Sequence, residues 1–469
     1  MLPTPTNYAI YPGVVPANTA VEMTLVPTER SFLFFSDMPY LITVISVNAD
    51  EPYYHVPQNP VTFSVTAQGG VLHFSYSFPD EQEHLILLSR EGEKPFAELS
   101  VYSLFDDLFS LRPLRGDLHS HSYRSDGRRD PSALAGHYRE QGYDFFALTD
   151  HNRAYPGDEI DQTYAGVKMG LARVRGEEIH APGSVLHVVH VGGKESVAER
   201  YVHDMEGYER EIAEYESRVP GHIPAQYHAR YARAMWTADQ IHAAGGLAIF
   251  AHPYWRPGRK AFNVCDAFAR ILLMSGMFDA YELVGGMGQE GINRSIALWQ
   301  ELRAEGLNLP VVGSSDVHGI AKAETFPHLF TICFAEQNEN DAIIAAVKAG
   351  RSVAVEASGG EYDRQYRCYG SLRLVGYAHF LLRRYFPQIQ RICAGEGVAM
   401  RAYAMGEADA ALIEQQAAQT ENFRRRFFGE ILPVVPSQAV QDFTEHCRDR
   451  QKNGPDGKGS LLGTGKIQL

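Results

Sequence analysis

The chain has 469 residues, enough for two or three domains, and 45% of them are hydrophobic, as in an ordinary globular protein. Its formal charge of −14 argues against nucleic acid as the main partner, because non-specific binding to a phosphate backbone depends on Lys and Arg contacts. No apolar run approaches the roughly 18 residues of a membrane span, and the N-terminus has no basic region followed by an apolar one. The five cysteines show no paired spacing, so we expect reduced or buried thiols. Together these features predict a cytoplasmic protein with no membrane partner.

Residues 1–112 contain short segments in which apolar and polar residues alternate, separated by Pro, Gly and Asp turns. Examples are residues 21–25, 41–45 and 61–65. The pattern predicts a small β-sandwich-like domain. Such a domain could bind carbohydrate or a partner protein, but a packing role is the simpler interpretation. It would shield the following domain or join two copies of it, so the chain could form a homo-oligomer.

The middle of the chain, residues 113–357, repeats a unit of helix, glycine and short apolar strand. The order of these elements is typical of an α/β domain in which helices connect parallel strands, and it predicts a barrel-like sheet. The helices are expected to begin at the N-cap Asp130, at a capping box of Thr237 with Gln240, and near Ser295. The strands that follow are residues 145–148, 247–251 and 309–312.

Three further segments complete the predicted organisation. Residues 195–236, rich in Tyr, Glu and Arg, are expected to form a helical insert that covers one rim of the barrel and shapes specificity. Residues 358–448 are expected to be mostly helical, and residues 449–469 to be a disordered tail.

Nine side chains of the metal-ligand type form one ordered series, and most of them lie at or just past the carboxyl end of a predicted strand. That rim is where α/β barrels and sheets assemble their active sites. Six imidazoles and three carboxylates are enough for more than one divalent cation. The nine are His119, His121, Asp126, His151, Glu178, His187, His252, Asp316 and His318.

The series resembles the polymerase and histidinol phosphatase (PHP) domain of the amidohydrolase-like metal-dependent phosphoesterases. The motifs that carry the resemblance lie between Gly116 and Gly319, about half of the chain. The resemblance implies a distorted seven-stranded, TIM-like β/α barrel with a bi- or trinuclear site for Zn, Mn or Fe. The motifs, in order, are His119-x-His121, Ser125-Asp126-Gly127, Thr149-Asp150-His151-Asn152, Gly176-x-Glu178, His187, His252-Pro253 and Asp316-x-His318.

Carried over by motif, the resemblance divides the nine residues among three cations. The first set is His119, His121, Glu178 and Asp316; in the second, Glu178 bridges to a cation held also by His187 and His252; the third set is Asp126, His151 and His318. Many trinuclear relatives have histidine where this chain has Asp126, and an oxygen donor there shifts the preference toward Mn or Fe.

Two of these assignments have a neighbouring alternative. Glu177 competes with Glu178, which fits the family spacing of one residue after the glycine. His190 competes with His187, and only one of them can face the site, because residues three apart on a strand point to opposite faces.

The resemblance implies hydrolysis of a phosphate ester by a metal-bound hydroxide that is held by Glu178, Asp316, His119 and His121. Three divalent cations, three carboxylates and this hydroxide leave a net charge of about +2, which suits a small anionic substrate. We also consider Asp150 a candidate to orient His151.

Arg153, Arg256 and His222 are candidate substrate contacts. The leading hypothesis is a metal-dependent phosphoesterase acting on a small phosphorylated molecule. The alternatives are a carboxylic or carbamic ester hydrolase with the same hydroxide, and a non-catalytic metal-containing binding protein.

Overall fold

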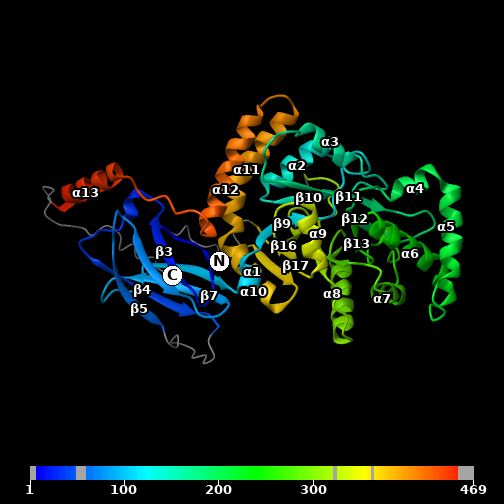
Figure 1. Ribbon diagram of the computed structural model, residues 1–469, viewed down its shortest axis with the longest axis horizontal. Helices are drawn as coiled ribbons and strands as arrows, with labels where there is room; N and C mark the ends of the chain where they lie inside the picture. The colour runs from blue at the N-terminus through cyan, green and yellow to red at the C-terminus, as the bar shows by residue number, and fades with distance from the viewer. Residues whose placement is uncertain (1–6, 49–59, 321–324, 361–363, 453–469) are drawn as a thin grey trace. The chain divides into compact units, whose positions relative to one another are not determined.

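The computed structural model describes residues 7–48, 60–320, 325–360 and 364–452 (Figure 1). By contacts, the described chain separates into two units. One holds residues 110–424, and the other holds the described residues up to 109 together with those from 425 onward. The four predicted domains stay a prediction, and the contact units divide the helical C-terminal region at a different place.

The N-terminal unit contains two sheets, antiparallel apart from one parallel pair at an edge of the larger sheet, that share one hydrophobic core. Met23 and Leu72 of the smaller sheet pack in the same cluster as Ile42 and Ile86 of the larger one. In β7 (Gln82–Ser89) buried and half-buried residues alternate, as a strand with one face on a core requires. The smaller sheet has the order β1 (Tyr8–Tyr11), β3 (Ala20–Pro27), β6 (Leu72–Ser77); the larger has the order β2 (Val14–Pro16), β8 (Ala97–Leu104), β7 (Gln82–Ser89), β4 (Pro39–Ser46), β5 (Val61–Thr66). The segments predicted as strands at 21–25, 41–45 and 61–65 lie in β3, β4 and β5.

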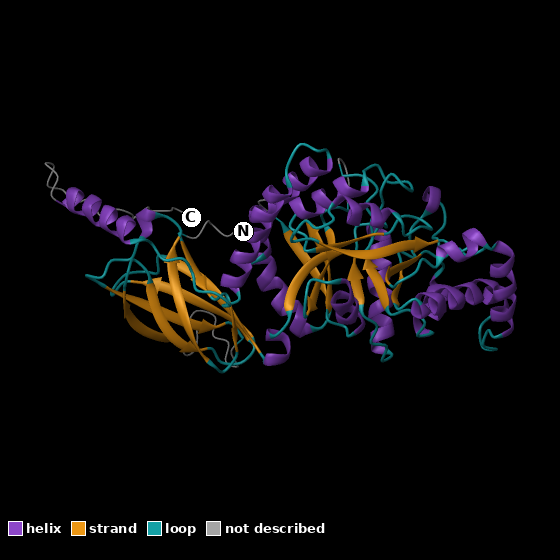
Figure 2. Ribbon diagram, turned by 45° about the horizontal axis from the view of Figure 1, so that its top comes forward, coloured by secondary structure: helices purple, strands orange, loops and turns teal. Residues whose placement is uncertain are grey.

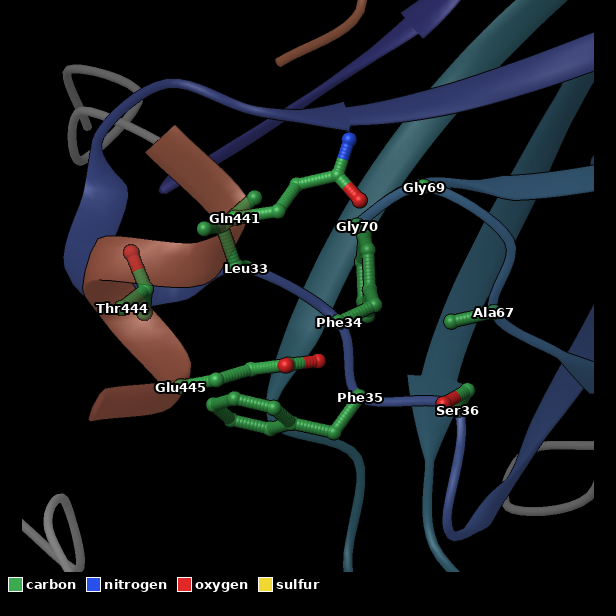
Figure 3. Close-up of a pocket in the computed structure, with 10 residues that line it drawn as sticks. All are labelled: Leu33, Phe34, Phe35, Ser36, Ala67, Gly69, Gly70, Gln441, Thr444 and Glu445. Carbon is green, nitrogen blue, oxygen red and sulfur yellow. The ribbon is translucent and has the colours of Figure 1, made fainter. Parts of the chain in front are cut away.

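Helix α13 (Gln438–Lys452) packs on this unit. Arg448 donates to both carboxylate oxygens of Asp37, at 3.0 and 2.9 Å, and its guanidinium lies 3.9 Å from the centre of the Phe35 ring. Figure 3 shows Gln441 and Glu445 of α13 pointing toward a pocket of about 60 Å³ beside Phe35. The tail predicted to be disordered from 449 is wrong for its first four residues, which end α13. Its remainder, 453–469, lies outside the described residues.

The other unit is built on a ten-stranded sheet in which the seven strands β9 to β15 are consecutive neighbours (Figure 1). The predicted α/β class is confirmed at this level. The sheet order is β15 (Val311–Gly313), β14 (Ala280–Val284), β13 (Gly246–Phe250), β12 (Val188–Gly192), β11 (Ala172–Ile179), β10 (Phe145–Leu148), β9 (Arg112–Asp117), β16 (Leu329–Ala335), β17 (Ser352–Ser358), β18 (Gln365–Tyr369).

Strand direction differs from the prediction at one place. Strands β9, β10 and β11 run parallel, as do β13, β14 and β15, but β12 is antiparallel to both of its neighbours. Only residues 180–187 connect β11 to β12. A parallel crossover needs about a dozen residues or more, so this connection can only turn the chain back.

The two ends of the seven-strand run meet at the carboxyl edge of the sheet. The backbone N–H of Asp316 donates to the carbonyl of His119 at 2.9 Å, and that of His121 donates to the carbonyl of Val317 at 3.0 Å. Further along, the Thr331 hydroxyl of β16 bonds to both backbone groups of Gly313, at 3.0 and 2.7 Å. The sheet is therefore strongly curved, and a closed seven-stranded barrel stays a prediction.

Helices flank this sheet (Figure 2). The N-cap prediction for α2 is confirmed, because the Asp130 carboxylate accepts from the N–H groups of Ser132 and Ala133 at 2.9 and 3.1 Å. The capping box predicted at Thr237 is wrong. Thr237 lies buried inside α6, since the apolar face of that helix extends upstream to Tyr231. The helices are α2 (Pro131–Glu140), α3 (Pro156–Thr163), α4 (Ala198–His203), α5 (Met205–Ser217), α6 (His228–Ala243), α7 (Asp266–Met274), α8 (Gln289–Ala304), α9 (Asn340–Lys348), α10 (Leu372–Arg384), α11 (Phe386–Ala404) and α12 (Ala410–Phe427).

The segment predicted as a helical insert, residues 195–236, contains α4, α5 and the first part of α6. Among the described residues, no helix is long and apolar enough to cross a lipid bilayer.

Candidate metal centre

Histidines and carboxylates gather at the edge of the sheet where most of its strands end. His119, His151, His252 and Asp316 each follow a strand, namely β9, β10, β13 and β15. His187 instead precedes β12, and it reaches the same edge because β12 runs in the opposite direction. The antiparallel strand therefore brings a fifth element to the edge without a crossover helix.

Glu178, in β11, lies at the middle of this group. Its carboxylate oxygen Oε1 is 2.9 Å from His187 Nδ1, 3.1 Å from His252 Nε2 and 3.3 Å from His180 Nε2. The side chain is only 1% exposed. A carboxylate oxygen has two lone pairs, so hydrogen bonding alone does not account for three imidazole nitrogens around this buried atom.

The other oxygen of Glu178 has a similar environment. Oε2 is 2.8 Å from His151 Nδ1, 3.2 Å from His119 Nε2 and 3.4 Å from His121 Nε2. One carboxylate thus faces two groups of imidazoles, which is the arrangement needed to bridge two cations.

Asp316 adds a second carboxylate to the His119 and His121 side. Its Oδ1 lies 3.0 Å from His121 Nε2 and 3.3 Å from His119 Nε2. The backbone of Asp316 has φ of 51°, a left-handed conformation that a non-glycine residue keeps only when its surroundings hold it there. Gly286 leaves room for this carboxylate, because a Cβ at that position would overlap Asp316 Oδ2.

Asp126 forms a more open group at the surface. Its Oδ1 is 3.2 Å from His318 Nε2 and its Oδ2 is 3.3 Å from His151 Nε2. The Asp126 side chain is 54% exposed, against 1% for Glu178. A cation here would be reached by solvent more easily than one beside Glu178.

The donor atoms are better suited to binding divalent cations than to forming hydrogen bonds with one another. Their ligand atoms form groups in which all lie within 4.8 Å of each other, and imidazole with carboxylate is a donor set for Zn, Mn or Fe. Buried polar atoms are normally hydrogen-bonded. Among the described residues, the buried atoms that lack a hydrogen-bond partner include Nε2 of His119, both ring nitrogens of His121, Nδ1 of His151, Nε2 of His180, Nδ1 of His187, Oε2 of Glu178 and Oδ1 of Asp316.

All nine predicted residues lie in these groups, whereas the two alternatives lie elsewhere. Glu177 Oε1 is 3.0 Å from His190 Nδ1, and its carboxylate also accepts from the hydroxyl of Ser196 and the N–H of Val197, both at 2.6 Å. The placement therefore favours Glu178 and His187 as ligands. Glu177 and His190 form a buried pair that fastens the start of the insert to the sheet.

Two residues of the site were missed from the sequence. Glu282 Oε2 accepts from His119 Nδ1 at 2.9 Å, and it belongs to a fully buried strand, where a carboxylate is a signal of function. His180 reaches Glu178 as described above. The signal was its position two residues after Glu178, since such residues share one face of a strand.

Asp117 positions the two chain segments that carry the first ligands. Its buried carboxylate accepts from the N–H groups of His119 and Ser315, at 3.1 and 3.0 Å, and from the Tyr138 hydroxyl at 2.7 Å. Burial raises the pKa of Asp117 to about 6, although these hydrogen bonds lower it. Asp117 thus holds the backbone of both the segment after β9 and the segment after β15.

The interpretation that Asp150 orients His151 is wrong. The Asp150 carboxylate instead accepts from Ser122 N–H at 2.8 Å, Ser122 hydroxyl at 2.6 Å and Ser125 hydroxyl at 2.5 Å. It therefore holds the loop that carries Asp126.

The three candidate substrate contacts do not lie in the ligand groups. Arg153 Nε donates to the carbonyl of His151 at 3.1 Å, so it is close to the site but bound to backbone. Arg256 is exposed and donates to Glu290 at 3.3 Å and to the carbonyl of Lys260 at 3.0 Å. His222 is exposed in the segment between α5 and α6.

Trp255 lies at the edge of the site. Its ring centre is 5.5 Å from that of His187 and 6.3 Å from that of His252, and the residue is 37% exposed. An apolar surface is therefore available next to the imidazoles.

The histidines respond differently to this environment. Burial lowers the pKa of His252, but hydrogen bonding to Glu178 and the charge of Asp316 raise it to about 9. The pKa of His119 is also raised well above its ordinary value, because Asp316, Glu178 and Glu282 outweigh its burial. Burial lowers the pKa of His187 to about 4. The negative charge of the carboxylates thus favours positive charge, from a proton or a cation, around His119 and His252.

Comparisons with known proteins give the following relatives. No family model matches the chain. Over 82 residues the chain is 34% identical to the DNA polymerase/3'-5' exonuclease PolX of Bacillus subtilis, and the match covers 16% of this chain and 14% of that protein. It therefore spans about one seventh of the relative's length.

Two solved structures match parts of the chain at low sequence identity. A two-domain protein from Bacteroides vulgatus that contains a predicted PHP-like metal-dependent phosphoesterase is 17% identical, with a TM-score of 0.38 over 53% of this chain and 66% of that one. An amidohydrolase from Chromobacterium violaceum is 16% identical, with a TM-score of 0.31 over 45% of this chain and 89% of that one. The PHP-like description of the first of these structures agrees with the resemblance that the motifs indicated.

Proposed function

We propose that this chain is a metal-dependent hydrolase, a phosphoesterase that cleaves a small phosphorylated molecule at a bi- or trinuclear centre of Zn, Mn or Fe. The observation that carries the proposal is the position of Glu178. Both oxygens of this buried carboxylate face imidazole nitrogens from strands that are far apart in the sequence. A scaffold would not require so many unpaired donor atoms at one point.

In this proposal the strands β9 to β15 serve as the distorted seven-stranded barrel. His119, His121, Glu178 and Asp316 hold the first cation; Glu178, His187 and His252 hold the second; Asp126, His151 and His318 hold the third. The third set is the most exposed, so we expect it to bind its cation most weakly.

Divalent cations at such a site activate water near neutral pH and withdraw charge from the phosphoryl oxygens of a substrate. The residues of the chain prepare the site for this chemistry. Glu282 accepts from His119 Nδ1 and so directs Nε2 of the same ring toward Glu178. Asp117 fixes the backbone on both sides of the first set.

The substrate would enter past Trp255 and the exposed group of Asp126. The excess of positive charge in a loaded centre favours an anionic group in the pocket. Trp255 offers an apolar surface to the part of the molecule that leaves. A small phosphate ester combines both properties.

The test is hydrolysis by protein loaded with Mn, Zn or Fe across phosphate monoesters, phosphodiesters and aryl acyl or carbamoyl esters. We expect turnover of a phosphate ester that falls at least about 100-fold in His119→Ala. The matched control is His203→Ala, since His203 is an exposed histidine of α4.

Other results would assign another function. Metal-dependent turnover of acyl or carbamoyl esters alone would assign the chain to that class of hydrolase. Metal binding without any turnover would point to a binding protein.

A further inference from the structure

His180 lies immediately after β11, on the loop that leads to β12. Because it follows Glu178 by two residues, the two side chains leave the backbone on the same side. Its Nε2 lies 3.3 Å from Glu178 Oε1 and, among the described residues, has no hydrogen-bond partner. The motif resemblance assigns no role to this histidine.

The His180 ring is packed between two proposed ligands. Its centre is 3.7 Å from that of His187, with the planes inclined by 30°, and 4.3 Å from that of His151, inclined by 46°. One ligand atom each of His151, Glu178 and His180 lies within 4.8 Å of the others. The ring therefore lies close enough to Glu178 to share a cation with it.

The backbone of His180 is also fixed. Its N–H donates to Asn152 Oδ1 at 2.8 Å, and the Tyr201 hydroxyl donates to the same oxygen at 2.6 Å. Asn152 in turn donates its own N–H to the carbonyl of Glu178 at 2.8 Å. The φ of Asn152 is 55°, in the left-handed region. Tyr201 belongs to α4, so the helical insert holds the loop of the metal centre through Asn152.

We propose that His180 is a tenth ligand of the metal centre, which binds a divalent cation of the Zn, Mn or Fe type together with Glu178. Tyr201 acts as a positioning residue that keeps His180 in this place through Asn152. The inference rests on the proposed metal centre, but not on the identity of the substrate. An additional imidazole would raise the affinity of the centre for borderline cations. It would partly offset the preference for harder cations that the oxygen donor Asp126 gives to the neighbouring set.

The experiment uses the full chain, stripped of metal with a chelator and titrated with Zn²⁺ and Co²⁺. Calorimetry gives the number of cations and their affinities, and the visible absorption of Co²⁺ reports the ligands around it. We expect His180→Ala to weaken one class of cation about 10- to 100-fold and to change the Co²⁺ spectrum. Tyr201→Phe should weaken the same class by a smaller factor.

His203→Ala is the matched control, because it removes an exposed imidazole of the insert. His180→Gln, with circular dichroism of each variant, separates loss of a ligand from loss of the fold. Unchanged affinities and an unchanged Co²⁺ spectrum in folded His180→Ala, with normal binding by the unsubstituted chain, would overturn this inference alone. If the unsubstituted chain bound no cation, both the inference and the proposed function would fail.

Discussion

Glu177 and Glu178 are adjacent in β11, but their carboxylates serve opposite faces of the sheet. Glu178 faces the imidazoles of the candidate metal centre, whereas Glu177 pairs with His190 and holds the start of the insert through Ser196. Both are fully buried. The same residue type thus has two different roles, set by the alternation of side chains along a strand.

This pair provides a matched test of the metal centre. Glu178→Gln removes the charge that both imidazole groups face, so we expect loss of at least one bound cation and a fall in activity of about 100-fold or more. Glu177→Gln should leave the metal content unchanged but lower the free energy of unfolding by about 1–3 kcal/mol, because buried partners of a charged group are weakened. Metal analysis and urea unfolding of both variants check this. Equal metal loss in the two would contradict the assignment.

Glu282 should act on the centre through His119. Glu282→Gln keeps the volume of the side chain but no longer supplies a charged acceptor to His119 Nδ1. We expect the affinity for the first cation to fall about 10- to 100-fold, as for other carboxylates that orient a metal-bound histidine. Competition with a coloured chelator measures this affinity. Glu290→Gln, an exposed carboxylate of α8, is the control and should have no effect.

Trp255 should report cation binding by its fluorescence. The chain has three tryptophans; Trp236 is 0% and Trp299 is 8% exposed, whereas Trp255 is 37% exposed and lies beside His187. We expect Co²⁺ to quench the emission of the unsubstituted chain and of Trp299→Phe, but only weakly that of Trp255→Phe. Strong quenching that persists without Trp255 would place the cation elsewhere.

The C-terminal helices should be needed for the stability of the sheet unit. Arg139 of α2 is 1% exposed and donates to Glu396 of α11 at 2.7 Å. Glu396→Ala would remove the nearest carboxylate and leave Asp144, 3.6 Å away, as the remaining charged partner of this buried guanidinium, so we expect a loss of about 3 kcal/mol of stability. Urea unfolding measures the loss, and Glu407→Ala, an exposed carboxylate, should change stability by less than about 0.5 kcal/mol. A chain that ends at Gly370, after β18, and is as stable as the full chain would contradict this role.

His84 should make the N-terminal unit less stable in acid. Burial lowers the pKa of His84 to about 4, and its ring bonds to the hydroxyls of Ser103 and Ser46 at 2.9 and 3.2 Å. Protonation therefore favours the unfolded chain, where the pKa is about 6.5. The stabilisation is complete above pH 6.5 and is lost as the pH falls toward 4, for a total of about 2–3 kcal/mol.

Urea unfolding between pH 7.5 and 4.5 measures this change. His84→Gln cannot titrate, so it should show a smaller decrease of stability over the same range. His73→Gln is the control, because His73 is an exposed histidine of β6 in the same unit. An equal decrease in His84→Gln would contradict the prediction.

The sequence by itself determined the ordered series of candidate ligands and most of the short strands beside them. Both depend on local properties: apolar runs form buried strands, and the residues that follow such strands come to one edge of the sheet. The N-cap of α2 at Asp130 was predictable for the same reason, since a cap involves neighbours in the chain.

Only the tertiary structure decided which of two close residues faces the site. Alternation shows that Glu177 and Glu178 point to opposite faces, but which face is lined by imidazoles depends on strands far away in the sequence. Glu282 and His180 come close to the candidate ligands for the same reason. The pairing of Arg139 with Glu396 also belongs here, because a buried charge finds its partner through packing between distant helices, which no local pattern encodes.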